Sequence, residues 1–341
     1  MRSIDKPANI DDFDKGIVYI ESKVDKIRLS NNCIIIEGKD IKYVPICQVG
    51  TLVIRGDTSI TTSLLSELIE NGVSISLLGY YGNYKCTVHS DICGNVEVRH
   101  NQLRKSDSIE GFSIGRNVII AKMKNQLAVV DRHIRNYGHS ELIDKTIDNI
   151  NKYIEFATIS MSKTQLIGYE GKAAEQYFGI FNQLIRKQGF NFNGRSHNPP
   201  LDNVNAMLSF GYGLLRVETE RNIRLCGLDP FVWFIHSERS GKKSLALDLM
   251  EEYRPYMVDR MILSLVNMGM VDPKSFIIES DAVMCDSETR IKIIDEFQKR
   301  KNEYIKFKGK SITYGELMFR QMQLLVRAIK GKERYKTYIW R

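Results

Sequence analysis

The sequence contains few residues of the kinds that cross-link a chain or anchor it in a membrane. Six cysteines occur in 341 residues, at positions 33, 47, 86, 93, 226 and 285. Their spacing indicates no disulfide framework, so we expect a reducing, cytoplasmic environment. No apolar run reaches the roughly 18 residues that a membrane-spanning helix needs. The start MRSIDKPANIDDFDKG is polar and charged, so we expect neither a signal peptide nor an anchor there.

Signatures of several function classes are also missing or incomplete. No G-x-S-x-G elbow is present, which disfavours an acyl-transfer serine. SGKKS at 240–244 has His236 where a phosphate-binding loop needs glycine. Gly211 and Gly213 lack the third glycine and the preceding strand of a dinucleotide fingerprint. A zinc site is disfavoured because the spacing is poor and the segment is interpreted as a β hairpin; its four candidate ligands are Cys86, His89, Cys93 and His100.

The charge distribution is uneven along the chain. The formal net charge is +8, and residues 299–341 hold 13 Lys and Arg against 3 Glu, so this segment carries +10 and the remainder −2. A basic end on a near-neutral body indicates a surface for a polyanion. A solubilising helix face followed by a tail would have the same composition, and charge alone leaves both interpretations open.

Residues 15–100 are predicted to be rich in β-strands. Short apolar runs recur at strand length between clusters of Asn, Gly, Asp and Ser: GIVYI, KIRLS, CIIIEG, IKYVPI, TLVIRG and VSISLLG. One helix is expected at 60–72, where Leu64, Leu65 and Leu68 share a face and Gly72 provides a stop. GYYGNY at 79–84 predicts a turn between two strands.

From about residue 105 the apolar residues recur every three or four positions, which predicts helices. The expected helices are 114–135, 140–157, 162–188, 201–226, 243–268, 288–306 and 312–330, the fifth of them interrupted at Pro255. A length of 341 residues favours two domains. The predicted fold class is therefore α+β, with an N-terminal β-strand domain over 1–100 and a larger all-α domain over 101–341.

Acidic and imidazole side chains occur in three separate settings. Glu170 lies in GYEGKAAEQYF, His236 in FIHSERSG, and Asp248, Glu251 and Glu252 in SLALDLMEEYRP. One imidazole and several carboxylates form a hard ligand set of the kind that holds Mg²⁺ or Mn²⁺. In a basic protein such an ion indicates phosphodiester chemistry, because the metal polarises a phosphoryl oxygen and activates an attacking hydroxyl.

Each setting also has a simpler interpretation. Glu170 alone would be a solvated helix carboxylate, although Gly168 and Gly171 beside it suggest close approach by another helix or by a substrate backbone. His236 alone would be a packed, hydrogen-bonded histidine after the apolar run FVWFI. The acids after Ser244 would form a solvated helix face, except that three acids within five positions repel one another.

The order of the motifs resembles a known family. GYEGKAAEQYF is followed by RSHNPPLDNVNAMLSFGYGLL, FIHSERSG and SLALDLMEEYRP, and GNVEVRHNQ at 94–102 is similar to that family's junction between its β and helical domains. The chain resembles the CRISPR-associated adaptation integrase, the DNA-cutting and DNA-joining subunit numbered one among the CRISPR-associated proteins. The resemblance covers nearly the whole chain and implies the same two-domain fold.

The resemblance also implies a metal site made of a Glu, a His and a second acid. It assigns these roles to Glu170, His236 and Glu251 as the catalytic ligands of Mg²⁺ or Mn²⁺, with Asp248 one turn earlier as a helper. Many family members have Asp where this chain has Glu251. Which of Asp248, Glu251 and Glu252 contacts the metal first therefore stays open.

For the reaction, the resemblance implies that a 3′-hydroxyl of incoming DNA attacks a phosphodiester of the CRISPR repeat, or that water does so in a nuclease reaction. Homodimers with the β domain as platform would join the second-numbered CRISPR-associated protein and hold double-stranded DNA, both prespacer and repeat. Phosphate contacts are expected from Arg239, Lys242 and Lys243, which would otherwise be solvated loop charges, and from Arg195. Tyr212 is expected near the site or in the core.

Two other functions remain as alternatives. The chain would be a catalytically idle DNA-binding scaffold of the same complex if the ligand residues did not hold a metal. It would be a transposon-borne relative if it carried an extra DNA-binding domain, and we expect none after Trp340. The presence of all three ligand types favours the enzyme.

Overall fold

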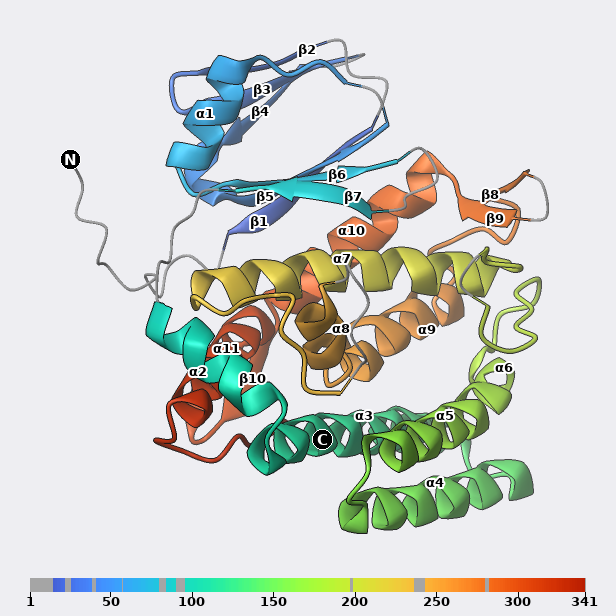
Figure 1. The fold of residues 1–341 in the computed structure, drawn as a ribbon. Coiled ribbons are helices and arrows are strands. Elements are labelled where there is room, and N and C mark those ends of the chain that lie inside the picture. Colours follow the sequence, from blue (N-terminus) through green and yellow to red (C-terminus); the bar gives the residue numbers. More distant parts are fainter. Residues whose placement is uncertain are drawn as a thin grey trace.

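A strand-rich N-terminal region is followed by a larger helical region in the computed structural model (Figure 1). The structure describes residues 15–21, 26–38, 41–56, 58–79, 84–89, 96–196, 199–235, 243–279 and 282–340. The predicted fold class, α+β with β first, is confirmed. Within the described ranges, no helix is both long enough and apolar enough to cross a membrane.

The N-terminal region contains two sheets and one helix. Its elements are β1 (Gly16–Glu21), β2 (Lys26–Ser30), β3 (Cys33–Glu37), β4 (Ile41–Pro45), the short 3-10 helix η2 (Ile46–Gln48), β5 (Val49–Arg55), α1 (Thr62–Glu70), β6 (Ser74–Leu78) and β7 (Tyr84–Val88). One sheet has the order β1-β5-β6-β7, in which β1, β5 and β6 are parallel and β7 is antiparallel to β6. The other sheet is the antiparallel meander β2-β3-β4.

Strand β5 is buried along its whole length because it faces two cores. Leu52 and Ile54 point into an apolar core that is shared with the second sheet and α1. Val53, which lies between them, points to the other side and belongs to the core of the helical region. This alternation follows from the two-residue period of a strand. It makes one strand the link between the two regions.

The helical region begins at α2 (Val96–Ser106). It continues with α3 (Ile109–Tyr137), α4 (Glu141–Ile159), α5 (Lys163–Gly179), α6 (Phe181–Leu184), α7 (Asn203–Leu225), α8 (Ser244–Met250), the π-helical segment η3 (Arg254–Asp259), α9 (Arg260–Asn267), β8 (Phe276–Glu279), β9 (Ala282–Cys285), α10 (Ser287–Lys301), β10 (Tyr304–Phe307), β11 (Lys310–Thr313) and α11 (Tyr314–Ile329). Several helices begin where a side-chain oxygen accepts a backbone N–H, as at Ser108, Ser140 and Asp202.

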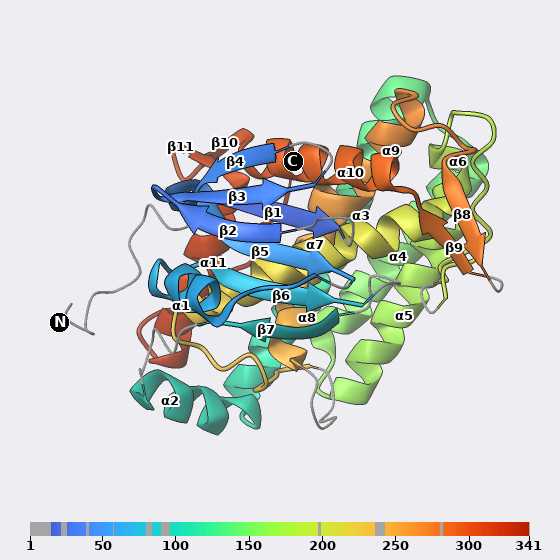
Figure 2. The same ribbon diagram turned by 90° about the horizontal axis from the view of Figure 1, so that it is seen from above.

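Helix α7 lies between the N-terminal sheets and the other helices (Figures 1 and 2). Its residues are mostly buried, because β5 packs on one side of it and α8 and η3 on another. Gly211 permits part of this packing, since a Cβ at that position would lie 2.7 Å from Cγ1 of Val258. The glycine in SFGYG is therefore explained by close packing of α7 against η3.

The sequence did not predict two hairpins in the helical region, β8–β9 and β10–β11. The second hairpin turns through Lys308 and Gly309, whose φ angles are 48° and 79°. Two residues with positive φ match the right-handed twist of a hairpin. Its strands therefore replace the end of the expected helix 288–306. The hairpin interpretation of residues 86–100 was also wrong in part, because His100 lies in α2.

Some basic residues of segment 299–340 are buried in the core, and others are exposed on the surface. Lys301 is 1% exposed, donates to the carbonyl of Lys15 at 2.8 Å and pairs with Glu218 at 3.0 Å. Arg300 is also buried, and its Nη1 donates to the carbonyl of Tyr256. The exposed basic residues of the segment are Lys299, Lys306, Lys308, Lys310, Lys332, Arg334 and Lys336. A surface for a polyanion would therefore be formed by these residues and not by the whole segment.

Candidate active site

Three charged side chains from distant parts of the chain meet at one point. Nζ of Lys122, on α3, contacts Oε1 of Glu170, on α5. The same nitrogen lies 2.7 Å from Oε2 of Glu251, which follows α8 directly. Two carboxylate oxygens that contact one nitrogen atom lie within a few ångströms of each other. The structure thus brings together two of the acids that the sequence predicted.

The cluster carries two positive charges beside its two carboxylates. The side chain of Lys122 is 8% exposed. Burial lowers the pKa of Lys122, but Glu251 and Glu170 raise it more, so the pKa lies above its usual value and the ammonium stays charged. Nη2 of Arg254 lies 3.2 Å from Oε1 of Glu251, and this guanidinium also remains charged.

The three neighbouring acids of the motif SLALDLMEEYRP face different partners. Glu251 contacts Lys122 and thereby meets Glu170. Asp248 is 1% exposed, and its Oδ2 accepts from the amides of Phe234 at 2.8 Å and Ile235 at 3.0 Å. Asp248 therefore holds the backbone that leads directly to His236, which lies outside the described residues.

Glu252 faces the C-terminal segment. Its oxygens accept from Nε2 of Gln321 at 2.9 Å, from the hydroxyl of Tyr335 at 3.2 Å and from the amide of Tyr338 at 2.7 Å. Burial raises the pKa of Glu252 to about 7, although these hydrogen bonds oppose the shift. These contacts attach the turn that carries Glu251 and Glu252, called here the acid-bearing turn, to the C-terminal segment.

Asn125 connects the same turn to α3. Its Nδ2 donates to the carbonyl of Glu252 at 2.9 Å, and its Oδ1 accepts from the amide of Trp340 at 2.8 Å. Asn125 lies three residues after Lys122, about one helical turn further along α3. The C-terminal segment thus ties together the helix that carries Lys122 and the turn that carries Glu251.

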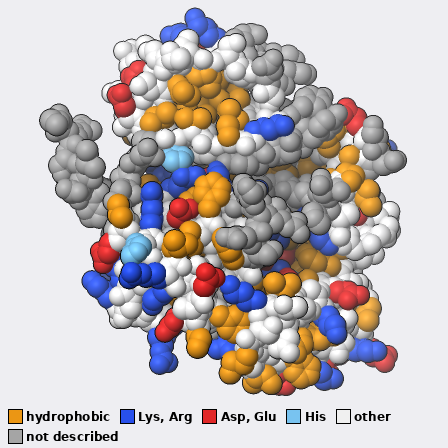
Figure 3. Space-filling model, in the orientation of Figure 1, with side chains coloured by type: hydrophobic (Ala, Val, Ile, Leu, Met, Phe, Trp, Pro, Cys, Tyr) orange, Lys and Arg blue, Asp and Glu red, His pale blue; other side chains and the backbone are white. Residues whose placement is uncertain are grey.

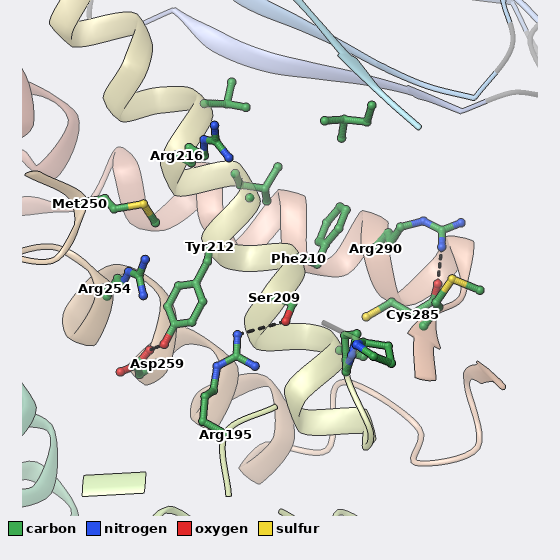
Figure 4. Close-up of a pocket in the computed structure, with 18 of the residues that line it drawn as sticks. Arg195, Ser209, Phe210, Tyr212, Arg216, Met250, Arg254, Asp259, Cys285 and Arg290 are labelled. Carbon is green, nitrogen blue, oxygen red and sulfur yellow. Dashed lines mark hydrogen bonds between the residues drawn. The ribbon is translucent and has the colours of Figure 1, made fainter. Parts of the chain in front are cut away.

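Tyr212 lies between two guanidinium groups (Figure 4). Cζ of Arg254 lies 4.8 Å from the centre of its ring, and Cζ of Arg195 lies 5.3 Å from it. Its hydroxyl donates to Oδ1 of Asp259 at 2.6 Å. Burial raises the pKa of Asp259 to about 6, and the hydrogen bond from Tyr212 opposes this shift. The expectation that Tyr212 lies near the site agrees with this geometry.

A cavity of about 950 Å³ runs from this cluster to the boundary with the β region. Its lining includes one buried acid, Asp259, and six basic side chains: Arg55, Lys122, Arg195, Arg216, Arg254 and Arg290. On the face drawn in Figure 3, Lys and Arg side chains gather below the N-terminal β region. We call this cavity the basic groove. Its charge suits a polyanion.

The structure describes two of the predicted phosphate contacts, Arg195 and Lys243. Arg195 lines the basic groove, where Nη1 donates to Oδ1 of Asn205 at 2.7 Å and Nη2 to Oγ of Ser209 at 3.0 Å. Lys243 is 8% exposed and contacts Oε1 of Glu220, so its surroundings are those of a structural ion pair. The other two, Arg239 and Lys242, lie outside the described residues.

The helix that carries Glu170 has an open side. Among the described residues, none lies within 4 Å of where a Cβ would stand on Gly168 or Gly171. No described helix therefore approaches these glycines, in contrast to one of the two interpretations that the sequence suggested. The other interpretation, approach by a substrate backbone, remains compatible with the open surface.

The residues present fit a small divalent cation. Mg²⁺ and Mn²⁺ prefer carboxylate oxygens, and an imidazole nitrogen suits Mn²⁺ better than Mg²⁺. Glu170 and Glu251 offer two such oxygens around a position next to a cationic nitrogen. Within the described ranges, no cluster of three or more His, Cys, Asp or Glu is arranged to hold a metal. The predicted third ligand, His236, is not among the residues searched.

Sequence reasoning missed Lys122 and Asp259. One signal was available for Lys122, which falls on the same helix face as the buried residues Val118, Ile119 and Gln126. A lysine on the buried stripe of an amphipathic helix requires a partner, because an isolated buried charge is strongly unfavourable. The pattern does not identify that partner, since both acids come from other elements.

Two carboxylates that meet at a lysine of a basic groove, in a helical region that follows a strand-rich region, suit a protein that acts on phosphate-rich polymers. The comparison with known proteins is more specific. The family model described as CRISPR associated protein Cas1 matches residues 18–299. The chain therefore belongs to the Cas1 family.

Curated relatives extend the match over nearly the full chain. The chain is 34% identical over 339 residues to "CRISPR-associated endonuclease Cas1 2" of Rhodospirillum rubrum, which covers 95% of this chain and 98% of that protein. It is 32% identical over 338 residues to "CRISPR-associated endonuclease Cas1 1" of Chlorobaculum tepidum, a match that covers 95% of this chain and 98% of that protein. Both matches extend across the β and helical regions.

Solved structures share the fold at lower identity. A casposase bound to integration product has a TM-score of 0.83 at 23% identity and covers 94% of this chain and 92% of its own. A CAS1 protein from Thermotoga maritima has a TM-score of 0.82 at 20% identity, with shares of 95% and 99%. A Cas6-RT-Cas1–Cas2 complex has a TM-score of 0.80 at 23% identity, with shares of 95% and 36%.

Proposed function

We propose that this protein is a metal-dependent DNA endonuclease and integrase that inserts new spacer DNA into a CRISPR array. One observation carries the proposal: the carboxylates of Glu170 and Glu251 converge on Lys122, a residue that also lines the basic groove. Membership of the Cas1 family supports the same reaction class. We also propose a cytoplasmic location, as expected from the cysteine pattern.

In this proposal Glu170, His236 and Glu251 hold Mg²⁺ or Mn²⁺, with Asp248 as a positioning residue. When bound, the ion would polarise a phosphoryl oxygen and favour ionisation of the attacking hydroxyl. Asp248 keeps the residues before His236 in place through the amides of Phe234 and Ile235. Arg254 offers its guanidinium to the negative charge that develops on the phosphoryl group.

The groove residues would orient the DNA. Arg55, Arg195, Arg216 and Arg290 line a path that leads away from the acid pair. In strand transfer, the incoming 3′-oxygen forms a bond to phosphorus while the bond to the 3′-oxygen of the repeat strand breaks. Water in place of the 3′-hydroxyl would give hydrolysis. Because the groove would bind phosphates, we expect DNA affinity to fall steeply as salt rises.

We further propose a homodimer through residues 1–100 and a catalytic domain over 101–341. Ile41 is 57% exposed and Tyr43 is 64% exposed on β4, an edge strand of its sheet. An edge strand with exposed apolar side chains favours symmetric pairing. We propose Cas2 as a partner, in keeping with the likeness to a chain of a Cas6-RT-Cas1–Cas2 complex. We propose double-stranded DNA as the substrate, which suits the basic side chains of the groove.

The test is strand joining on a supercoiled plasmid that carries a CRISPR repeat. Wild-type protein with Cas2 and prespacer DNA is expected to give joined products with Mn²⁺ and none with EDTA. Glu170→Gln and Glu251→Gln should each lower the rate by roughly 10²-fold or more, a loss typical of a group that stabilises transition-state charge. Glu175→Gln is the control, because Glu175 is an exposed carboxylate of the same helix α5.

A catalytically idle DNA-binding scaffold is the alternative. The neutralisation of Glu170 and Glu251 by Lys122 and Arg254 would also suit a chain that binds no metal. Metal-independent products, or DNA binding without any product, would reject the enzyme and favour the scaffold.

A further inference from the structure

The carboxylates of Glu170 and Glu251 meet at a side-chain nitrogen of the protein, Nζ of Lys122. Lys122 reaches them from α3, a helix that carries none of the predicted metal ligands. Neither family membership nor the predicted ligand set assigns a role to this side chain. Because its ammonium contacts both acids, Lys122 contributes to the charge balance of the candidate site.

The charges of the cluster balance without any added ion. Two carboxylates, Glu170 and Glu251, face two cations, Lys122 and Arg254. Two carboxylates that shared this space alone would repel each other. The ammonium of Lys122 therefore keeps the two acids together in the metal-free protein.

A divalent ion and this ammonium would compete for the same oxygens. Oε1 of Glu170 and Oε2 of Glu251 are the atoms that contact Lys122, and they are also the inward-facing oxygens of the pair. A divalent ion would lie closer to these oxygens than an ammonium does, at about 2.0–2.1 Å for Mg²⁺. Two cations at one position would repel strongly, so both do not occupy it together.

A route away from the acids exists for the lysine. Lys122 is among the residues that line the basic groove, and its flexible side chain can turn into that space without a change of the helix. We propose that Lys122 is the resident cation of the metal-free site and is exchanged for the divalent ion, after which its ammonium lies in the groove. This inference rests on the proposed function, because it takes the metal site as given.

The first experiment measures Mn²⁺ binding by the full-length protein from the loss of the electron paramagnetic resonance signal of free Mn²⁺. Lys122→Met should bind Mn²⁺ about 10- to 100-fold more tightly than wild type, because the ion no longer displaces a charge-assisted hydrogen bond. Lys124→Met is the matched control on an exposed position of the same helix, and its affinity should equal that of wild type. Glu170→Gln should abolish binding.

The second experiment uses wild-type protein and so does not depend on the folding of a variant. Reductive methylation followed by peptide mass spectrometry reports how accessible each lysine amine is. Mn²⁺ should raise the labelling rate of Lys122 several-fold, because exchange releases its amine into the groove. The rate at Lys124 should stay the same.

The outcomes separate the two proposals. Equal or weaker Mn²⁺ binding by Lys122→Met, or labelling of Lys122 that does not respond to Mn²⁺, overturns the exchange and leaves the metal site standing. Failure of wild type and Lys122→Met alike to bind Mn²⁺ contradicts both the metal site and the exchange. Tighter binding by the variant together with faster labelling in wild type supports both.

Discussion

The two regions of this protein bury different kinds of side chain. The core between the N-terminal sheets and α1 is apolar, with Ile34, Leu52, Leu68 and Ile75 fully buried. The helical region buries charged groups at 5% exposure or less: Glu218, Glu220, Arg221, Asp248, Glu251, Glu252, Asp259, Arg290, Arg300 and Lys301. An apolar core needs only correct volume, whereas each buried charge needs a partner.

The buried charges of the helical region include groups of the candidate site. Replacing a buried ion pair by apolar residues is often neutral or stabilising, so such pairs are weak evidence for stability alone. In the helical region Glu251 belongs to the site, and Asp248, Glu252 and Asp259 support it. We therefore expect apolar substitutions in the β region to change stability, and polar substitutions in the helical region to change activity as well.

The largest effect on stability is expected for Leu52→Ala in β5. Leu52 is completely buried, so the truncation should lower the free energy of unfolding by about 2–5 kcal/mol. Urea titration measures this loss, and Leu142→Ala, at a side chain that is 49% exposed, is the control. The strand-joining rate of the folded variant should remain within about two-fold of wild type. A large loss of rate without loss of stability would contradict the view that the core of the β region affects stability and not activity.

The second prediction concerns Asp259 and pH. Its pKa is raised to about 6 in the folded protein, so the folded state holds this proton more tightly than the unfolded state. The stability from Asp259 should be complete below about pH 4 and lost as the pH rises through 6, up to about 3 kcal/mol. Urea titrations between pH 4 and 7 should show a flatter profile for Asp259→Asn. The assignment of this pH dependence to Asp259 would be contradicted if the stability–pH profile of Asp259→Asn matched that of wild type. It would also be contradicted if Asp148→Asn, at an exposed position, flattened the profile equally.

The third prediction tests Asp248 as a positioning residue. Asp248→Ala removes the acceptor of two buried amides, which should cost about 1–3 kcal/mol of stability. The strand-joining rate should fall about 10- to 100-fold, as for residues that orient metal ligands. Asp248→Asn keeps an oxygen that accepts and should recover much of the rate. A rate that stays at the wild-type value in Asp248→Ala would assign the residue to stability only.

The smallest effect is expected for Tyr335→Phe. The variant loses the hydroxyl that donates to Glu252 at 3.2 Å, while Gln321 and the amide of Tyr338 still donate to this carboxylate. The expected loss is about 0.5–1.5 kcal/mol in urea titration. Tyr304→Phe, at a side chain that is 72% exposed, should show no loss. Equal behaviour of the two variants would mean that the hydroxyl of Tyr335 does not help to hold Glu252.

The strands of the N-terminal region were predictable because their signal is local. GIVYI, CIIIE and TLVIR are apolar runs of strand length between turn residues, and each forms the expected strand. The hairpins β8–β9 and β10–β11 were missed because each strand has only four residues and lies beside helices with strong periodicity. In YIKFKGKSIT, the pair Lys308 and Gly309 was the available signal.

The candidate site was predictable only in part. The motif SLALDLMEEYRP marked three acids, but spacing did not distinguish Asp248, Glu251 and Glu252, since all lie within about one helical turn. The three acids are distinguished by their partners in the fold. Asp248 accepts from the amides of residues 234 and 235, Glu251 contacts Lys122, and Glu252 accepts from the C-terminal segment. None of these contacts is local in sequence.

The amino-acid order by itself therefore determined the β-then-α organisation and marked Glu170 and Glu251 as candidate site residues, because strand and helix periods and short motifs depend on near neighbours. Only the tertiary structure decided that Lys122 stands between Glu170 and Glu251 and that Asp248 and Glu252 face away from them. The physical reason is that a buried charge is set by whichever partner packing brings within a few ångströms. Packing is a property of the whole fold.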